Sequence, residues 1–215
     1  MPPKRFSIGE AIGFGWEVTK ANFLLLVGLI VLSGLIGGLP QLINRDSSSA
    51  GLACIVGLLS TIVNTLIGLG LTNIALKLAD RQPVELSDLW SRAHLFLNYL
   101  VAEILYGLMV AVGLVLLIVP GIIVAIIFSF FAYVIVDHEA GPIESLSQSA
   151  AITKGARMDL FVFGLVLIGL NLLGAIALGV GLFVTTPISM VAVAYVYRQL
   201  AAQTGGTTPP GALAA

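Results

Sequence analysis

ILYGLMVAVGLVLLIVPGIIVAIIFSFFAYVIV, residues 104–136, is the stretch that decides the fold, because it carries no charged side chain. A transmembrane helix needs about 20 apolar residues to cross about 30 Å of hydrocarbon. This stretch is too long for one span, since a straight helix rises about 1.5 Å per residue and would reach about 50 Å. Pro120 and Gly121 stand at its middle, where proline interrupts helical hydrogen bonds and glycine permits a tight reversal. We therefore predict two spans joined by a short turn.

Three further uncharged runs extend this pattern along the chain. Two lie between Lys20 and Arg45 and between Asp46 and Lys77, and each is long enough for one span. The third, residues 160–197, is long enough for two and contains helix breakers such as Pro187. The predicted fold class is therefore all-α: a polytopic membrane protein with six transmembrane helices in three helical hairpins, plus cytoplasmic-side amphipathic interfacial helices. The predicted spans cover about 21–42, 52–76, 95–118, 121–137, 159–180 and 184–200.

These spans form one predicted domain. We expect a single integral membrane domain over 1–202, in which an interfacial helix over 7–20 precedes the first span. Ser7 and Glu10 have the spacing of a capping box, which marks the start of that helix. Residues 203–215 are rich in glycine and proline and predict a flexible C-terminal tail.

The overall composition excludes a soluble globular domain. Apolar residues make up 58% and charged residues 10% of the 215 residues, whereas soluble domains contain about 25% charged residues. The net charge is −1 and no basic stripe is present, which argues against nucleic acid as a partner. We expect membrane lipids as partners, together with a membrane protein or a second copy of the chain.

The basic residues predict the orientation, because Lys and Arg near span ends are retained in the cytoplasm. With six spans, nine of the ten basic residues fall on one side and only Arg45 falls on the other. This distribution predicts that both termini lie in the cytoplasm. The nine residues are Lys4, Arg5, Lys20, Lys77, Arg81, Arg92, Lys154, Arg157 and Arg198.

Two further amphipathic segments are predicted at the cytoplasmic surface. After Pro83, an apolar face that includes Leu86 and Leu89 lies opposite a polar face that includes Asp88. A weaker pattern runs through residues 142–157. Such helices lie in the plane of the lipid headgroups. The candidate partner or lipid interface comprises Trp16, Trp90, Ile143, Glu144, Leu146, Lys154 and Arg157.

Residue types for catalysis or metal binding are scarce. The two histidines, His94 and His138, have no histidine four residues away, and the single Cys54 has no second cysteine to pair with. The chain contains no nucleotide-binding glycine loop and no serine-nucleophile elbow. We therefore predict no catalytic residue, no cofactor and no metal site, and we expect that the chain is not an enzyme.

Glu103 stands out because it lies about 12 Å inside the third predicted span. An ionised carboxylate at the bilayer centre costs about 3 kcal/mol, so it should face protein, water or a cation. One interpretation is a proton or cation site. The other is a boundary carboxylate that is hydrogen-bonded or reaches for Arg92 or Lys154. Glu103 forms the candidate polar intramembrane site with Asn64 and Asn171.

Several motifs carry a family resemblance. They are LIVPGII at 117–123, Val136 with Asp137, GPIESL at 141–146, Ser149, TKG at 153–155, and Tyr197 with Arg198. In these motifs the chain resembles the membrane domain associated with some bacterial glycerophosphoryl diester phosphodiesterases, and related uncharacterised multi-pass inner-membrane proteins. The similarity covers about residues 5–200. In the family an aromatic residue often follows the serine that matches Ser149, whereas this chain has Ala150.

That resemblance implies a membrane module without a transferable reaction. In the family, the phosphodiesterase activity belongs to a separate soluble domain, and no such domain fits into 215 residues dominated by six spans.

Our leading hypothesis is a non-enzymatic bacterial inner-membrane scaffold or accessory subunit that binds a partner protein or lipids at the cytoplasmic interface. One alternative is a small transporter or channel whose polar path passes the three residues of the polar intramembrane site. The other alternative is an intramembrane enzyme that acts on lipids, with Asp137, His138 and Glu139 near the headgroups.

Overall fold

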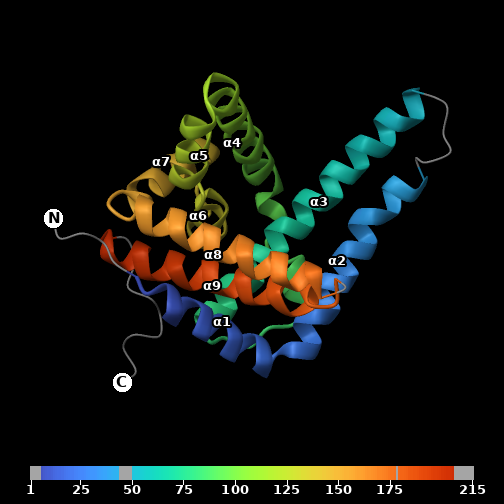
Figure 1. Cartoon of the computed structure of the whole chain (residues 1–215). Helices are drawn as coiled ribbons and strands as arrows, with labels where there is room; N and C mark the ends of the chain where they lie inside the picture. Colours follow the sequence, from blue (N-terminus) through green and yellow to red (C-terminus); the bar gives the residue numbers. More distant parts are fainter. Residues whose placement is uncertain (1–5, 44–49, 178, 206–215) are drawn as a thin grey trace.

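The structure, a computed structural model, describes residues 6–43, 50–177 and 179–205, and the regular elements in these ranges are all helices (Figure 1). Lys4, Arg5 and Arg45, which enter the predicted orientation, and residues 206–215 of the predicted tail lie outside the described residues. The elements are α1 (Ile8–Ala21), α2 (Phe23–Ile43), α3 (Ala50–Ala79), the 3-10 helices η2 (Leu86–Leu89) and η3 (Ala93–Leu95), α4 (Phe96–Leu116), α5 (Ile118–Ile127), α6 (Phe131–His138), α7 (Pro142–Thr153), α8 (Arg157–Ile176) and α9 (Leu182–Gln203).

The structure supports a polytopic membrane protein. Four helical stretches are long and apolar enough to cross a membrane, and a fifth is added if α1 and the first part of α2, which meet at a bend of 92°, count as one span. Large apolar side chains such as Leu24, Val115 and Ile168 are exposed on these helices, as expected where a surface faces lipid. The all-helical class is confirmed, whereas six spans in three hairpins stay a prediction. The four stretches are Cys54–Ala79, Leu86–Leu116, Ile118–His138 and Arg157–Ile176.

Helix α9 is enclosed by several other helices. Its residues Val191, Ala192 and Tyr197 are completely buried, because α1, α3 and α8 all pack on it. In Figure 1, α1 and α8 run along α9 across the lower part of the molecule. The α2–α3 pair and the α4–α5 pair project from this layer as two diverging arms.

The first helix begins where the capping pattern predicts. The Ser7 hydroxyl accepts a hydrogen bond from the Glu10 amide at 3.3 Å, which satisfies one of the amides left free at a helix start. The helix ends at Ala21, and Asn22 caps it with hydrogen bonds from its backbone amide and side chain to the Val18 carbonyl. The chain then turns sharply into α2.

Helix α1 runs antiparallel to α9 along its length. Phe14 stacks on Tyr195 with ring centroids 4.5 Å apart, whereas Lys20 shares a pocket of about 320 Å³ with Val184. Gly15 permits this close approach, because a Cβ there would stand 2.6 Å from a carbonyl oxygen of α9. The predicted topology places Lys20 in the cytoplasm and residue 184 at the outer end of the last span. The structure instead places the two residues beside the same pocket.

The amphipathic helix predicted after Pro83 is wrong, because two short 3-10 helices take its place. Asp88, predicted to face solvent, is buried together with Leu89. Leu89 packs so closely on α3 that a Cβ at Gly70 would clash with its backbone. Asp88 is buried because it pairs with Lys77 of α3, a long-range contact that sequence spacing does not reveal.

Residues 104–136, the uncharged stretch on which the fold prediction rests, form most of α4, all of α5 and most of α6. The chain reverses at Leu117, whose backbone is extended, and Pro120 and Gly121 lie in the first turn of α5. Gly113 of α4 packs against this turn, since a Cβ at Gly113 would lie 2.8 Å from the Gly121 Cα. Residues 128–130 divide the predicted span 121–137 into α5 and α6.

Candidate functional site

A buried charge cluster joins the ends of α3, α6 and α9. Arg198 donates hydrogen bonds to Asp137 at 2.6 Å and to Asp80 at 2.7 Å, and the three side chains are at most 15% exposed. The Tyr197 hydroxyl also donates to Asp137, at 3.0 Å. Burial raises the pKa of the Asp80 carboxyl, although the adjacent Arg198 opposes the shift. The cluster fastens three helices, and its carboxylates are occupied by protein donors.

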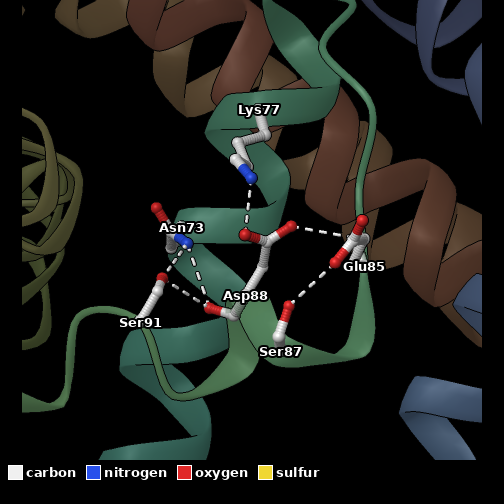
Figure 2. A network of polar contacts seen from close by, with 6 residues as sticks. All are labelled: Asn73, Lys77, Glu85, Ser87, Asp88 and Ser91. Atoms are coloured by element: carbon white, nitrogen blue, oxygen red, sulfur yellow. Dashed lines mark hydrogen bonds and ion pairs between the residues drawn. The ribbon is translucent and has the colours of Figure 1, made fainter.

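A second polar network fastens the loop after α3 to that helix (Figure 2). Lys77 pairs with the Asp88 carboxylate at 2.5 Å, and the same carboxylate accepts the Glu85 amide at 2.8 Å. Asn73 donates to the Asp88 carbonyl oxygen and to the Ser91 hydroxyl, both at 3.0 Å. Figure 2 shows these side chains converging on Asp88 from α3 and from the loop. The network explains why a charged loop segment packs against a predominantly apolar helix.

The candidate enzymatic residues Asp137, His138 and Glu139 are also held by protein partners. His138 lies 3.4 Å from the Asp137 carboxylate, which already binds Arg198. Glu139 accepts a hydrogen bond from Arg92 at 2.6 Å. Within the described ranges, no group of three or more His, Cys, Asp and Glu side chains is placed to hold a metal ion.

Helix α7 presents buried hydroxyl groups to the break between α5 and α6. Ser149 and Thr153 are completely buried. Ser149 accepts a hydrogen bond from the Phe130 amide at 3.0 Å, and both hydroxyls donate to the Ile127 carbonyl at 3.1 Å. Broken helices are tolerated at membrane depth only where such partners satisfy the freed backbone groups. Helix α7 therefore stabilises the break in the span Ile118–His138.

Two of the three residues of the polar intramembrane site meet between α3 and α4. Glu103 and Asn64 line one cavity of about 470 Å³, in which Glu103 accepts a hydrogen bond from the Thr65 hydroxyl at 3.1 Å. Glu103 has no ion-pair partner among the described residues, and Arg92, one of its expected partners, is held by Glu139 instead. The lining residues are Ser60, Thr61, Asn64, Thr65, Leu100, Glu103 and Ile104.

The third residue, Asn171, lies elsewhere. Its amide donates hydrogen bonds to the Leu167 carbonyl at 2.9 Å and to the Ser189 hydroxyl at 2.8 Å. These contacts link α8 to α9, and Asn171 does not line the cavity that contains Glu103. Its observed hydrogen bonds are those of a residue that packs two helices together.

The residues of the predicted interface differ in accessibility. Trp16 and Trp90 are half exposed and Ile143 is 77% exposed, so each can contact lipid or a partner. Glu144 is also exposed. Leu146 is only 7% exposed and belongs to the hydrophobic core, so it cannot contribute to docking.

The basic residues in the described ranges form two groups. One group is tied up in ion pairs with Asp or Glu: Lys77, Arg81, Arg92 and Arg198. The other group is exposed and forms no ion pair with a described residue: Lys20, Lys154 and Arg157. Each unpaired cation stands within a few residues of the start of an apolar helix, α2 for Lys20 and α8 for the other two.

Sequence reasoning missed several residues of these networks. Asp80 and Asn73 carried no signal, because a polar residue at the end of a helix is ordinary. Thr65 could have been found, since it lies one helical turn from Thr61 and next to Asn64. The hydroxyl residues of α7 could also have been found, because they are spaced four residues apart and therefore share one helix face: Ser145, Ser149 and Thr153.

Comparisons with known proteins point to membrane proteins of unknown function. A family model described as "Protein of unknown function (DUF975)" matches residues 108–204. A relative named "UPF0259 membrane protein SG1383", from Sodalis glossinidius (strain morsitans), is 33% identical over 113 residues, which are 52% of this chain and 43% of the relative. The chain thus matches less than half of that relative's length, and no solved structure matches.

Neither description names a glycerophosphoryl diester phosphodiesterase, so that resemblance stays a prediction. The matched residues 108–204 contain α5 to α9, and with them the broken span, helix α7 and Arg198. Together with the apolar helices, the two matches show that this chain is similar to uncharacterised bacterial membrane proteins.

Proposed function

We propose that the chain is a non-enzymatic inner-membrane scaffold or accessory subunit. It binds lipids or a partner protein at the cytoplasmic ends of its helices. Both termini are cytoplasmic in this proposal, because most basic residues then lie on the side where they are retained. The candidate docking surface is the corner between α7 and α8, which carries Lys154, Arg157 and Met158, with Ile143 at the other end of α7.

The division of the basic residues is the observation that carries this proposal. Arg198 and Lys77 neutralise buried carboxylates and hold helices together. Lys154 and Arg157 have no such partner among the described residues, and Met158 beside them is 73% exposed. An exposed cation next to an exposed apolar side chain at the start of an apolar helix suits the boundary between headgroups and hydrocarbon.

A lipid-competition experiment tests this proposal. The double variant Lys154→Gln with Arg157→Gln should lose about 2 kcal/mol of preference for an anionic lipid surface, since each basic residue near that surface contributes about 1 kcal/mol. The measurement is the ratio of phosphatidylglycerol to phosphatidylcholine retained by the purified protein from mixed bilayers, at low salt. Crosslinking in native membranes then reports whether a partner protein is also held there.

Arg81→Gln is the matched control. It removes one cation, but Arg81 pairs with Glu17 at 3.2 Å and both side chains are more than 60% exposed. The control should retain the lipid preference of the unaltered chain. Equal lipid ratios in the double variant and the unaltered chain would refute the docking surface.

A small transporter or channel is the second candidate function, and the cavity that joins Asn64 to Glu103 favours it. A carboxylate inside a span is typical of ion and proton pathways. Flux through proteoliposomes that Glu103→Gln abolishes would support transport. Flux that is absent, or unchanged in the variant, would remove this candidate.

A further inference from the structure

The cavity between α3 and α4 is unusual because polar groups gather there inside two candidate spans. Thr65 is 4% exposed and receives Glu103 from the opposite helix, whereas Glu103 and Asn64 are themselves exposed, so the cavity opens onto the surface of the two helices. The cavity has a volume of about 470 Å³, which is ample for a small ligand together with water. It lies outside residues 108–204, the part of the chain that the family model matches.

The hydrogen bonds of the lining residues show what kind of ligand fits. The Ser60 hydroxyl donates its proton to the Val56 carbonyl at 2.7 Å, and the Thr61 hydroxyl donates its proton to the Gly57 carbonyl at 3.0 Å. The Thr65 hydroxyl donates its proton to Glu103. A hydroxyl has one proton, so each of these oxygens can only accept a further contact.

Asn64 adds a further acceptor oxygen to these hydroxyl groups. Its amide nitrogen donates one of its two protons to the Ser60 carbonyl at 2.8 Å, and its side-chain oxygen is a further acceptor at the cavity. The Glu103 carboxylate adds two acceptor oxygens and a negative charge. The cavity therefore offers oxygen acceptors and one negative charge, and a complementary ligand must bring positive charge.

The charge balance sets the valence of that ligand. Among the described residues, no Lys or Arg forms an ion pair with Glu103. A carboxylate within hydrocarbon is stabilised by a counter-charge, and a single carboxylate is balanced by a single positive charge. Hydroxyl and amide oxygens are the neutral ligands that hard cations prefer.

We propose that this cavity binds a monovalent cation, held by the Glu103 carboxylate and by the hydroxyl and amide oxygens beside it. The inference does not depend on the lipid-docking surface, and it concerns binding rather than movement across the membrane. An alkali metal ion and an organic ammonium group share the required chemistry.

The test measures the melting temperature of the full chain in phosphatidylcholine nanodiscs by tryptophan fluorescence. NaCl, KCl and methylammonium chloride are compared with N-methyl-D-glucamine chloride, whose cation is too bulky for a site of this kind, at equal ionic strength. A bound cation stabilises the folded protein and raises the melting temperature in a saturable way. We expect such a rise with at least one of the three small cations.

Variants connect the rise to the cavity. Glu103→Gln should abolish it, and Asn64→Leu should weaken the apparent affinity about tenfold through the loss of one neutral ligand. Asn171→Leu is the matched control, because it removes an intramembrane amide outside the cavity, and it should keep the full response. If Glu103→Gln does not fold, the Asn64→Leu titration compared with the Asn171→Leu titration decides the question.

Three outcomes are decisive. A rise with Na⁺ or K⁺ identifies an alkali metal ion. A rise with methylammonium alone identifies an organic ammonium, and loss of that response in phosphatidylethanolamine nanodiscs identifies the lipid headgroup as its source. Identical melting temperatures in all four salts, with Asn64→Leu unaffected by the choice of salt, would overturn the proposal.

Discussion

The Ser149 hydroxyl accepts a hydrogen bond from the Phe130 backbone amide at 3.0 Å, across the break that separates α5 from α6. Phe130 lies in the break itself, whereas Ser149 belongs to α7, 19 positions further along the chain. A residue of α7 thus completes the hydrogen bonding of a span to which it does not belong. Helix α7, predicted as an interfacial segment, is an internal support of the membrane-spanning part.

Ser149→Ala should therefore destabilise the protein. The substitution leaves the buried Phe130 amide without its acceptor, and an unsatisfied buried donor costs about 1 to 3 kcal/mol. The measurement is the free energy of unfolding in mixed micelles. Ser147→Ala, at an exposed position of the same helix, is the control and should change stability by less than about 0.5 kcal/mol. Equal stability of both variants would contradict the supporting role of α7.

Arg198→Gln should be among the most destabilising single substitutions. It leaves Asp80 and Asp137 buried without their shared cation, and removal of one partner from a buried ion pair costs about 3 to 5 kcal/mol. The triple variant with Asp80→Asn and Asp137→Asn removes the stranded charges and should recover part of this loss. Thermal unfolding ranks the stabilities of the unaltered chain, Arg198→Gln and the triple variant. A triple variant less stable than Arg198→Gln would refute the role of Arg198 as the counter-charge of the two carboxylates.

The same variant should respond to pH. Burial already raises the pKa of Asp80 above its ordinary value of 3.8 in the presence of Arg198, and loss of that cation raises it further. An acid whose pKa is higher in the folded state favours folding when it is protonated. Arg198→Gln should therefore gain stability relative to the unaltered chain as the pH falls through that raised pKa toward 3.8. A constant difference over this range would contradict the prediction.

Gly113→Ala tests the close contact between α4 and α5. The added Cβ would lie 2.8 Å from the Gly121 Cα, so the two helices must move apart, and overpacking of this kind costs about 1 to 3 kcal/mol. Gly107→Ala is the matched control on the same helix, because a Cβ there meets no atom within 4 Å. The control should be neutral or stabilising by up to about 1 kcal/mol, as alanine favours helix more than glycine.

The sequence predicted the features that depend on local pattern. The start of α1 follows from Ser7 and Glu10, and the apolar helices follow from charge-free runs long enough to cross hydrocarbon. These features need no knowledge of which helix contacts which. The same holds for the proximity of α4 and α5, because a short turn leaves two consecutive helices little choice of neighbour.

Features that depend on long-range pairing could not be predicted. Asp88 was predicted to face solvent, but it is buried beside its ion-pair partner Lys77. Leu146 was predicted to lie at an interface, but it is buried in the hydrophobic core. Glu103 could be predicted as a site residue, because a carboxylate stands out in an apolar span. Its hydrogen bond to Thr65 could not, because the two residues lie 38 positions apart. The break at 128–130 has no proline or glycine to announce it.

The packing of α1 on α9 makes a prediction about sidedness. Lys20 and Val184 line one pocket, so we expect them on the same side of the membrane, whereas six full spans place them on opposite sides. Single cysteines at each position, Lys20→Cys and Val184→Cys, are introduced into a Cys54→Ala background and labelled with a membrane-impermeant maleimide. We expect both to react in the same preparation, either intact cells or inside-out vesicles. Ser147→Cys, at an exposed position of α7, serves as the reference for the side that the proposed topology makes cytoplasmic.

The result separates two descriptions of this helix pair. Joint labelling from either side would leave fewer than six spans, because Lys20 and Val184 lie at opposite ends of the predicted first and last spans, and four or five helical stretches are long and apolar enough to cross a membrane. Labelling from opposite sides would contradict the antiparallel contact at Gly15 and restore six spans. The antiparallel packing requires joint labelling, because Phe14 stacks on Tyr195 and thereby fixes the register that brings Lys20 to Val184.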